Sequence, residues 1–564
     1  MNGRGPDLDD SKESLDAARG LVARLEPGEI KDARGDVVWD ANAFSFLEGE
    51  CPPTANPRLW RHARLCARQG LFEVTEGIYQ IRGLDISNMT LIEGATGVLV
   101  VDPLVAAETA SAGLELYREH RGDLPVTGVV YTHSHVDHFG GVGGVTRGGV
   151  PILAPKGFME HAAAENVYAG SAMRRRGIFQ SGTLLPADPA GQVGLGIGPD
   201  VSKGTVTLIA PNREIARTGQ EEVVDGVRFV FQMTSGAEAP TEMNFYLPDR
   251  RALCMADNSL HTMHEILPLR GAPVRDARVW SRYLDEALAL FAHRSDILFA
   301  SHTWPTWGTD ELSTFLSEQR DMYAYLHDQT LRLLNQGLVG SEIAEQLELA
   351  PSLRRRWHTQ GYHGSISHNV KAVYQRYMGW FDGNPAHLWE HPPEEQAQRY
   401  VECMGGVDEV VRFAATLLDH AVFAEPGHRQ ARQTLADVYE RLGHGAENGN
   451  WRNFYLQGAV ELRDAAPTPA QGFGMGMTSA LRVDQLFDAV AVRVNGPEAW
   501  DEYFTIDWIF NDLDATYRTT LSHGALTTRA HPRSGEADLR VTLNKFRLLR
   551  LLAGKGTDGM EFDG

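Results

Sequence analysis

The stretch Tyr131-Thr-His-Ser-His-Val-Asp-His-Phe-Gly-Gly141 decides the fold of this chain. It places three histidines and one aspartate within six positions, and these are His133, His135, Asp137 and His138. The apolar, β-branched run at 126–131 predicts a buried strand in front of them. Because alternate side chains of an extended segment share a face, we expect the first two histidines to point the same way. The other two side chains then lie where the strand turns into a loop.

This pattern predicts a metal site. Imidazole and carboxylate groups are the ligands that Zn²⁺ and similar ions take when one position stays open for water. The geometry allows two imidazoles to bind one ion and the Asp/His pair to bind a second. The alternative is a polar loop that happens to be rich in histidine. Four candidate ligands directly after a buried strand argue against that alternative.

The composition is that of a globular protein with several domains. A length of 564 residues exceeds one domain, and 43% hydrophobic and 9% aromatic residues are typical values. The formal net charge of −21 argues against a nucleic-acid partner, because phosphate binding needs a basic face. No run of about 18 apolar residues predicts a membrane span. The first residues lack an apolar signal core, so we expect a cytoplasmic location, with a longer secreted precursor as the open alternative.

From residue 72 onward the chain alternates between strand-like and helix-like segments, which predicts a layered α/β domain. Strands are expected at 72–81, 97–102, 126–131, 149–154, 205–209, 227–231, 244–247, 252–255 and 297–300, and a helix at 106–119. After about residue 311, helical patterns dominate, as at 313–336, 406–422 and 435–442. Strand-like runs return at 488–494, 503–510 and 538–543. We therefore expect an N-terminal strap (1–70), a catalytic domain (71–312), a helical domain (313–464) and a C-terminal domain (465–564).

Three more candidate ligands follow strands of the α/β domain. Glu238 follows the expected strand 227–231, Asp257 follows 252–255, and His302 follows 297–300. Taken singly, an acidic residue after a strand is more often a cap or turn residue. After so strong a first motif, the three together become the favoured remaining ligands.

Several stretches of the chain resemble the zinc-dependent alkyl sulfatases, the type III sulfatases of the metallo-β-lactamase superfamily. They are 84–94, 97–104, the histidine motif, 237–243, 261–272 and 369–385. The resemblance covers residues from about 70 to 560. It implies an α/β fold of the metallo-β-lactamase αββα type, followed by an all-α dimerisation domain and an α+β C-terminal domain like sterol carrier protein 2.

The resemblance also implies two Zn²⁺ per chain. His133, His135 and Glu238 would bind one ion, and Asp137, His138 and His302 would bind the other. Asp257 stands nineteen positions after Glu238, where the family carries a bridging Glu. Its side chain is one methylene shorter, so the distance between the metals or the choice of metal is the main point of departure.

The implied reaction is hydrolysis of an alkyl sulfate ester to alcohol and inorganic sulfate by a zinc-bound hydroxide. Arg270 is the expected sulfate clamp, because a guanidinium matches a tetrahedral oxyanion bidentately. His264 is the expected general acid, with His261 as its competitor, and Asp137 is expected to act in catalysis as well. Tyr374 and Asn258 are candidate substrate-binding residues, with core packing and a turn as their alternatives.

The expected partners are a small amphiphilic sulfate ester and a second copy of the chain bound through the helical domain. Two other functions stay open at this point. One is hydrolysis of a different ester, such as a phosphate ester, lactone or thioester, by the same fold. The other is a lipid-binding protein with a vestigial metal site, against which the intact ligand set argues.

Overall fold

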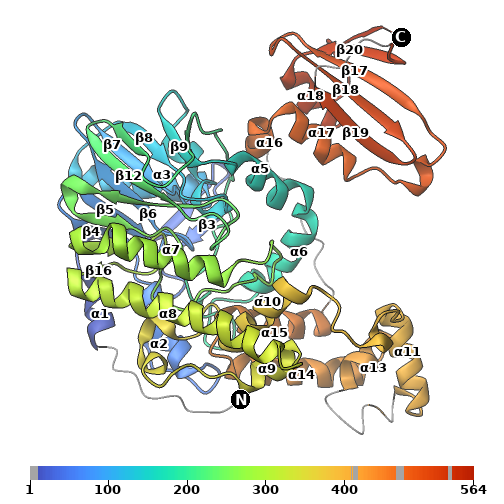
Figure 1. Ribbon diagram of the computed structural model, residues 1–564, viewed down its shortest axis with the longest axis horizontal. Helices are drawn as coiled ribbons and strands as arrows, with labels where there is room; N and C mark the ends of the chain where they lie inside the picture. The colour runs from blue at the N-terminus through green and yellow to red at the C-terminus, as the bar shows by residue number, and fades with distance from the viewer. Residues whose placement is uncertain (1–10, 408–409, 411–416, 465–474, 531–535, 564) are drawn as a thin grey trace.

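The largest domain is an αββα sandwich in which two sheets lie face to face between helices (Figure 1). The computed structural model describes residues 11–407, 410, 417–464, 475–530 and 536–563. The first sheet has the order β1-β4-β5-β6-β7-β8-β9-β10. Its strands are β1 (Leu21–Ala23), β4 (Gly70–Thr75), β5 (Ile78–Arg82), β6 (Met89–Glu93), β7 (Val98–Val101), β8 (Val126–Val130), β9 (Ile152–Pro155) and β10 (Arg213–Ile215). Strands β7 to β10 run parallel, whereas the earlier neighbours are antiparallel.

The second sheet supplies the other half of the sandwich, in the order β11-β12-β13-β14-β15-β16. Its strands are β11 (Glu221–Val224), β12 (Val227–Met233), β13 (Met243–Leu247), β14 (Ala252–Cys254), β15 (Ile297–Phe299) and β16 (Thr306–Trp307). Strands β14 and β15 pair in parallel, and helix α7 (Ala277–Leu290) lies between them in the chain. A parallel pair needs such a crossover, because no tight turn can join its two strands.

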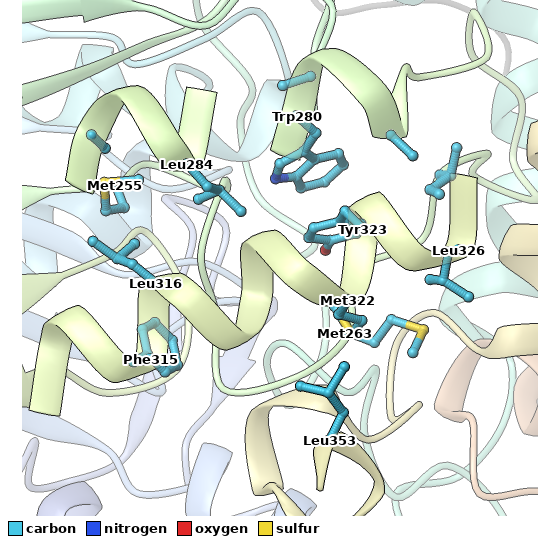
Figure 2. Packing of buried hydrophobic residues seen from close by; sticks show 14 of the residues in the cluster. Met255, Met263, Trp280, Leu284, Phe315, Leu316, Met322, Tyr323, Leu326 and Leu353 are labelled. Atoms are coloured by element: carbon cyan, nitrogen blue, oxygen red, sulfur yellow. The ribbon is translucent and has the colours of Figure 1, made fainter. Parts of the chain in front are cut away.

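Three layers of apolar side chains hold the sandwich together. Between the sheets, Leu99 and Val130 share a cluster with Phe231 and Phe245. Helix α3 (Ala107–Arg121) packs on the outer face of the first sheet. Helices α7 and α8 (Thr309–Leu334) cover the second sheet, where Trp280 stacks on Tyr323 with ring centroids 4.5 Å apart (Figure 2).

The N-terminal residues wrap this domain. They form α1 (Ser11–Ala18), strand β1 at the edge of the first sheet, the hairpin of β2 (Glu29–Lys31) and β3 (Val37–Asp40), and α2 (Pro57–Cys66). The start of helix α2 is capped. Asn56 accepts hydrogen bonds from the Arg58 and Leu59 amides, and proline occupies the first helical position.

The remaining helices border the sandwich or follow it. Within the first domain lie α4 (Val142–Val145), α5 (Phe158–Ala163), a π-helical turn (Ala164–Tyr168) and α6 (Gly170–Ser181). After α8 come α9 (Gly340–Gln346), α10 (Ile366–Met378), α11 (Pro393–Cys403), α13 (Leu418–Ala424), α14 (Arg429–Gly445) and α15 (Gly449–Arg463). Part of the expected helical segment 406–422 lies outside the described residues. Across the described ranges, no helix is both long and apolar enough to cross a membrane.

The C-terminal residues form a separate α+β unit, drawn in orange and red in Figure 1. Its sheet has the order β19-β18-β17-β20-β21, with β17 (Phe504–Phe510), β18 (Ala515–Ser522), β19 (Ala525–Ala530), β20 (Leu539–Leu543) and β21 (Glu561–Asp563). Helices α16 (Met475–Ala480), α17 (Val483–Ala491) and α18 (Lys545–Leu552) accompany it. The expected architecture of sandwich, helical region and α+β unit is confirmed.

Three of the expected strands differ from the structure. The segment 72–81 is not one strand but contains parts of β4 and β5, which pair in an antiparallel hairpin. Residues 205–209 form no strand, because their backbone hydrogen bonds go elsewhere: Thr205 O accepts from the Ala107 amide, and the Thr207 amide donates to Gly140 O. Most of 488–494 belongs to helix α17, in which Val483, Leu486 and Phe487 are buried at helical spacing. A short apolar run is compatible with both the strand period of two residues and the helix period of about 3.6. Here the buried residues that begin at position 483 follow the helical period.

Candidate metal centre

The seven expected metal ligands lie together at one end of the sandwich strands. His133 and His135 follow β8 in extended backbone, and Asp137 and His138 belong to the single 3₁₀ turn that comes next. Glu238, Asp257 and His302 follow β12, β14 and β15 respectively. Neighbouring strands therefore deliver ligands that are far apart in the sequence to the same edge. All are buried except Asp137, whose side chain is 18% exposed.

The ligands form two groups that match the expected division. In the first group, Glu238 Oε2 lies 3.3 Å from His133 Nε2 and 3.1 Å from His135 Nδ1. In the second group, Asp137 Oδ2 lies 3.1 Å from His138 Nε2 and 3.4 Å from His302 Nε2. Each group therefore offers three donor atoms around one point.

Asp257 faces both groups. Its Oδ2 atom lies 3.9 Å from His133 Nε2, 3.5 Å from His138 Nε2 and 3.2 Å from His302 Nε2. The aspartate side chain is thus long enough to reach the space between the two groups. Asp257 therefore lies close to imidazoles of both groups.

Several donor atoms in this cluster make no hydrogen bond to the described residues. They are the Nε2 atoms of His133, His138 and His302, with Glu238 Oε2 and Asp257 Oδ1. Buried polar atoms are ordinarily paired, so unpaired ones require an explanation. Converging imidazole nitrogens and carboxylate oxygens fit a divalent cation such as zinc.

Hydrogen bonds on the far side of the rings aim the Nε2 atoms at the centre. His138 Nδ1 lies 3.0 Å from Asp102 Oδ2, and His302 Nδ1 lies 2.8 Å from the Ile86 carbonyl oxygen. Asp102 also accepts hydrogen bonds from Thr132 and from Ser301, and it has a positive φ of 51°. Such partners fix the tautomer and orientation of a metal-binding histidine.

Burial and charge set the protonation of the cluster. Burial, with the neighbouring His138, lowers the pKa of His133 to about 4. Burial would also lower the pKa of His135, but the charges of Glu238 and Glu165 raise it to about 9. Burial would raise the pKa of Glu238, but the charges of Arg275 and His135 hold it well below its usual range. Burial, with the charges of Glu238 and Asp257, raises the pKa of Glu242 well above its usual range.

His264 and Arg270 lie beside the first ligand group. His264 Nε2 is 3.8 Å from Glu238 Oε1, and its Nδ1 accepts a hydrogen bond of 2.9 Å from Arg275. Because a guanidinium only donates, the hydrogen of this imidazole resides on Nε2. Arg270 Nη1 lies 3.3 Å from Glu165 Oε2, and that carboxylate is 3.7 Å from His135 Nε2.

The other expected residues lie apart from the ligands. Asn258 is buried and donates to Thr234 and Asn244, and its backbone oxygen accepts from the Trp280 indole. Tyr374 packs against the apolar cluster of α7 and α8. The alternative acid His261 has Glu13 and Thr306 at its two ring nitrogens, so neither nitrogen faces the ligands.

Four residues of the centre were missed in the sequence: Asp102, Glu165, Glu242 and Arg275. Asp102 ends a strand that the sequence predicted, and a carboxylate directly after a buried strand was the available signal. Glu165 lies in the π-helical turn, and Arg275 immediately precedes Asp276, the residue that caps α7. These two positions carry no periodic pattern that would single them out.

Comparison with known proteins identifies the family of this centre. Residues 82–302 match the sequence model of the metallo-beta-lactamase superfamily, 339–465 that of alkyl sulfatase dimerisation, and 473–564 that of the alkyl sulfatase C-terminal region. A linear primary-alkylsulfatase of Pseudomonas sp is 46% identical, over 97% of this chain and 85% of that protein. This chain belongs to the alkyl sulfatase family.

Other members support the assignment. An (R)-specific secondary-alkylsulfatase of Pseudomonas sp is 44% identical, over 97% of this chain and 85% of that protein. The solved structure of the stereoselective inverting sec-alkylsulfatase Pisa1 from Pseudomonas sp superposes with a TM-score of 0.96 and 43% identity, covering 100% of this chain and 93% of that one. This alkyl sulfatase thus combines the fold of a sulfuric ester hydrolase family with buried clusters that fit metal ions.

Proposed function

We propose that this alkyl sulfatase hydrolyses alkyl sulfate esters to an alcohol and inorganic sulfate at a centre of two zinc ions. The observation that carries the proposal is the pair of buried ligand groups sharing Asp257, with Arg270 beside them. His133, His135 and Glu238 would hold one ion, and Asp137, His138 and His302 the other. When bound, two such ions lower the pKa of a shared water toward neutrality.

The protein residues would place the ester and the water. Arg270 is only partly buried, and its guanidinium presents donors that match a sulfate group bidentately. Asp137 is the most exposed of the expected ligands, so we assign it the role of orienting the attacking water. Asn258 and Tyr374 contact core groups, which makes them weaker candidates for substrate contact.

His264 would act through the hydrogen on Nε2. Burial and the Arg275 charge hold the pKa of His264 well below its usual range, so the imidazole is neutral. A neutral imidazole donates a hydrogen bond well but is a weak source of a full proton. That suits a leaving group which is itself a weak base, as sulfate is. We therefore propose that the C–O bond breaks and that His264 donates to the departing sulfate oxygen.

The similar solved enzyme is described as inverting, which agrees with attack at carbon in that protein. Hydrolysis of dodecyl sulfate in ¹⁸O-labelled water tests both the reaction and the bond. We expect sulfate release, with the label in dodecanol. Label in sulfate would overturn C–O cleavage. Turnover of a phosphodiester or lactone without sulfate release would overturn the sulfatase assignment itself.

The number of metal ions is tested separately. Elemental analysis of the purified protein should give about two zinc ions per chain. One ion per chain would restrict the centre to a single group, and less than one would favour a binding protein over an enzyme. A variant that removes the shared carboxylate, Asp257→Ala, should lose metal, whereas the exposed Asp296→Ala should keep it.

We also propose that two copies of the chain associate through the helical domain. The segment between α10 and α11 exposes large apolar side chains: Trp380 is 75% exposed, Leu388 64% and Trp389 94%. Large apolar side chains that are exposed so close together in the chain favour an interaction surface there. Light scattering of the purified chain should give the mass of a dimer, and Trp389→Ser should shift it toward the monomer.

A further inference from the structure

Helix α1 is fastened to the body of the catalytic domain at several points. Arg68 Nη1 donates to the Ser14 carbonyl at 2.7 Å, and Arg82 Nη2 donates to the Arg19 carbonyl at 3.4 Å. The Arg19 guanidinium lies over the Trp307 ring, 4.4 Å from its centroid. Cationic groups near the end of a helix complement its exposed carbonyls. The N-terminal helix is therefore a fixed part of this domain.

One side chain of α1 reaches inward. The Glu13 side chain is 13% exposed, and its Oε2 atom lies 3.0 Å from His261 Nδ1. The same oxygen accepts a hydrogen bond of 3.0 Å from the Trp304 indole. The His261 and Trp304 rings stack on one another with centroids 4.8 Å apart. A single carboxylate oxygen thus joins two side chains that also contact each other.

These two side chains belong to the loops of the metal centre. His261 lies on the loop after β14, between Asp257 and His264. Trp304 lies on the loop after β15, two residues beyond His302. The loops also touch through their backbones, where the His261 amide donates to Thr303 Oγ1 at 3.3 Å. Thr303 has a positive φ of 58°, a conformation that a non-glycine residue keeps only when its surroundings hold it.

The carboxylate is ionised in this position. Burial alone would raise the pKa of Glu13, but His261 and the Trp304 hydrogen bond lower it to about 2. A buried charge whose two partners come from different loops constrains both loops. If either loop moves, the charge loses a partner while it stays buried, and this is unfavourable.

We propose that Glu13 is a positioning residue that connects the loop of Asp257 and His264 to the loop of His302. The position of the N-terminal helix thereby affects the geometry of the metal centre. Glu13 touches neither the ligands nor the expected substrate position, and its effect passes through His261 and Trp304. The inference rests on the proposed function only in that these loops carry the proposed ligands and acid.

The test is Glu13→Gln, which keeps the length of the side chain and removes its charge. Its control is Lys12→Ala on the same helix, because Lys12 is 54% exposed and pairs with Asp16 and Glu311. Outer partners of a metal site are worth roughly 10–100-fold in metal affinity or activity. We expect Glu13→Gln to weaken zinc binding about 10-fold or more in competition with a chromophoric chelator. Amide exchange in the peptides covering 257–266 and 300–307 should become faster.

Further outcomes decide the proposal. For the loaded enzyme we expect kcat to fall and KM for dodecyl sulfate to stay within about two-fold, a split that general destabilisation does not produce. If Glu13→Gln does not fold, Trp304→Phe removes one partner of Glu13 and should give the same changes more weakly. Unchanged zinc affinity and exchange in a folded variant overturn the proposal. If the parent chain binds zinc but releases no sulfate, the proposed function fails, while zinc affinity and exchange still test Glu13.

Discussion

The catalytic domain and the C-terminal unit differ in the ionisable groups they bury and the aromatic groups they expose. The catalytic domain buries ionisable side chains, among them Glu238, Asp257 and Arg275. The C-terminal unit exposes aromatic ones: Trp500 is 64% exposed, Tyr503 69% and Phe562 54%. Buried charges persist only where fixed partners compensate their lost hydration. Exposed aromatic groups need no such compensation, because they keep much of their contact with water.

The largest effect is expected from breaking a buried pair. Arg275 contacts Glu238 Oε1 and donates to His264, and it is 5% exposed. Arg275→Met should lower the free energy of unfolding by about 3–5 kcal/mol, because it leaves a buried carboxylate without its cation. Denaturant unfolding measures the change.

The matched control for that variant is Arg251→Met. Arg251 also pairs with a carboxylate, that of Asp296, through two hydrogen bonds, but at the surface, where both side chains are about half exposed. It should cost less than about 1 kcal/mol. Equal losses for the two variants would contradict the idea that burial, and not the pair itself, sets the cost.

The next effect concerns the guanidinium beside the centre. Arg270→Ala should lower kcat/KM for dodecyl sulfate by about 100-fold, since a charge-assisted contact contributes roughly 1.5–3 kcal/mol. Steady-state kinetics measure it, and Arg270→Lys should recover only part of the rate. Exposed Arg278, eight residues further on, provides the control. If Arg270→Ala and Arg278→Ala behave alike, Arg270 does not bind sulfate.

A smaller effect probes one partly buried acid of the catalytic domain. Burial raises the pKa of Asp200 to about 6, despite a hydrogen bond of 3.0 Å from Gln192. The unfolded chain therefore loses this proton first, and the side chain destabilises the fold increasingly as the pH rises from about 4 to 6. Asp200→Asn should raise the free energy of unfolding by about 1–3 kcal/mol at pH 7 and change it little at pH 4.

The contrasting variant for Asp200 is Asp296→Asn. Arg251 lowers the pKa of the Asp296 carboxyl, so its stabilisation is present above its ordinary pKa and is lost as the pH falls through the lowered value. Asp296→Asn should therefore change stability in the opposite direction at pH 7. Denaturant unfolding at pH 4 and pH 7 checks both variants, and a loss of stability for Asp200→Asn at pH 7 would refute the expectation.

The smallest effect is expected in the C-terminal unit. Trp500→Ser should change the free energy of unfolding by less than about 0.5 kcal/mol, because the side chain is exposed. If this unit gathers amphiphilic chains, KM should rise a few-fold for dodecyl sulfate and stay constant for hexyl sulfate. Leu15→Ser, at an exposed leucine of α1, is the control. Equal changes for both sulfates would argue against such a role.

The sequence predicts most of the sandwich because strand and ligand signals are local there. The run before His133 has the β-branched composition of a buried strand, and four potential ligands follow it within six residues. Residues 205–209 and 488–494 show the limit of such signals. Both are short apolar runs whose structure depends on contacts outside the run. Residues 205–209 bond to Gly140 and other backbone groups, and most of 488–494 continues helix α17.

The sequence by itself determined the metal-binding motif, the family resemblance and the candidate ligands after each strand, because these depend on residue types at fixed short spacing. Only the tertiary structure decided which atoms converge. In the folded protein, Asp257 lies within 3.9 Å of imidazoles from both groups, and Arg275 contacts both Glu238 and His264. Glu13 of the N-terminal helix contacts the loops of the centre. Such contacts join residues up to about 290 positions apart, and no periodic pattern in the chain records a pairing that arises only when the sheets and helices pack.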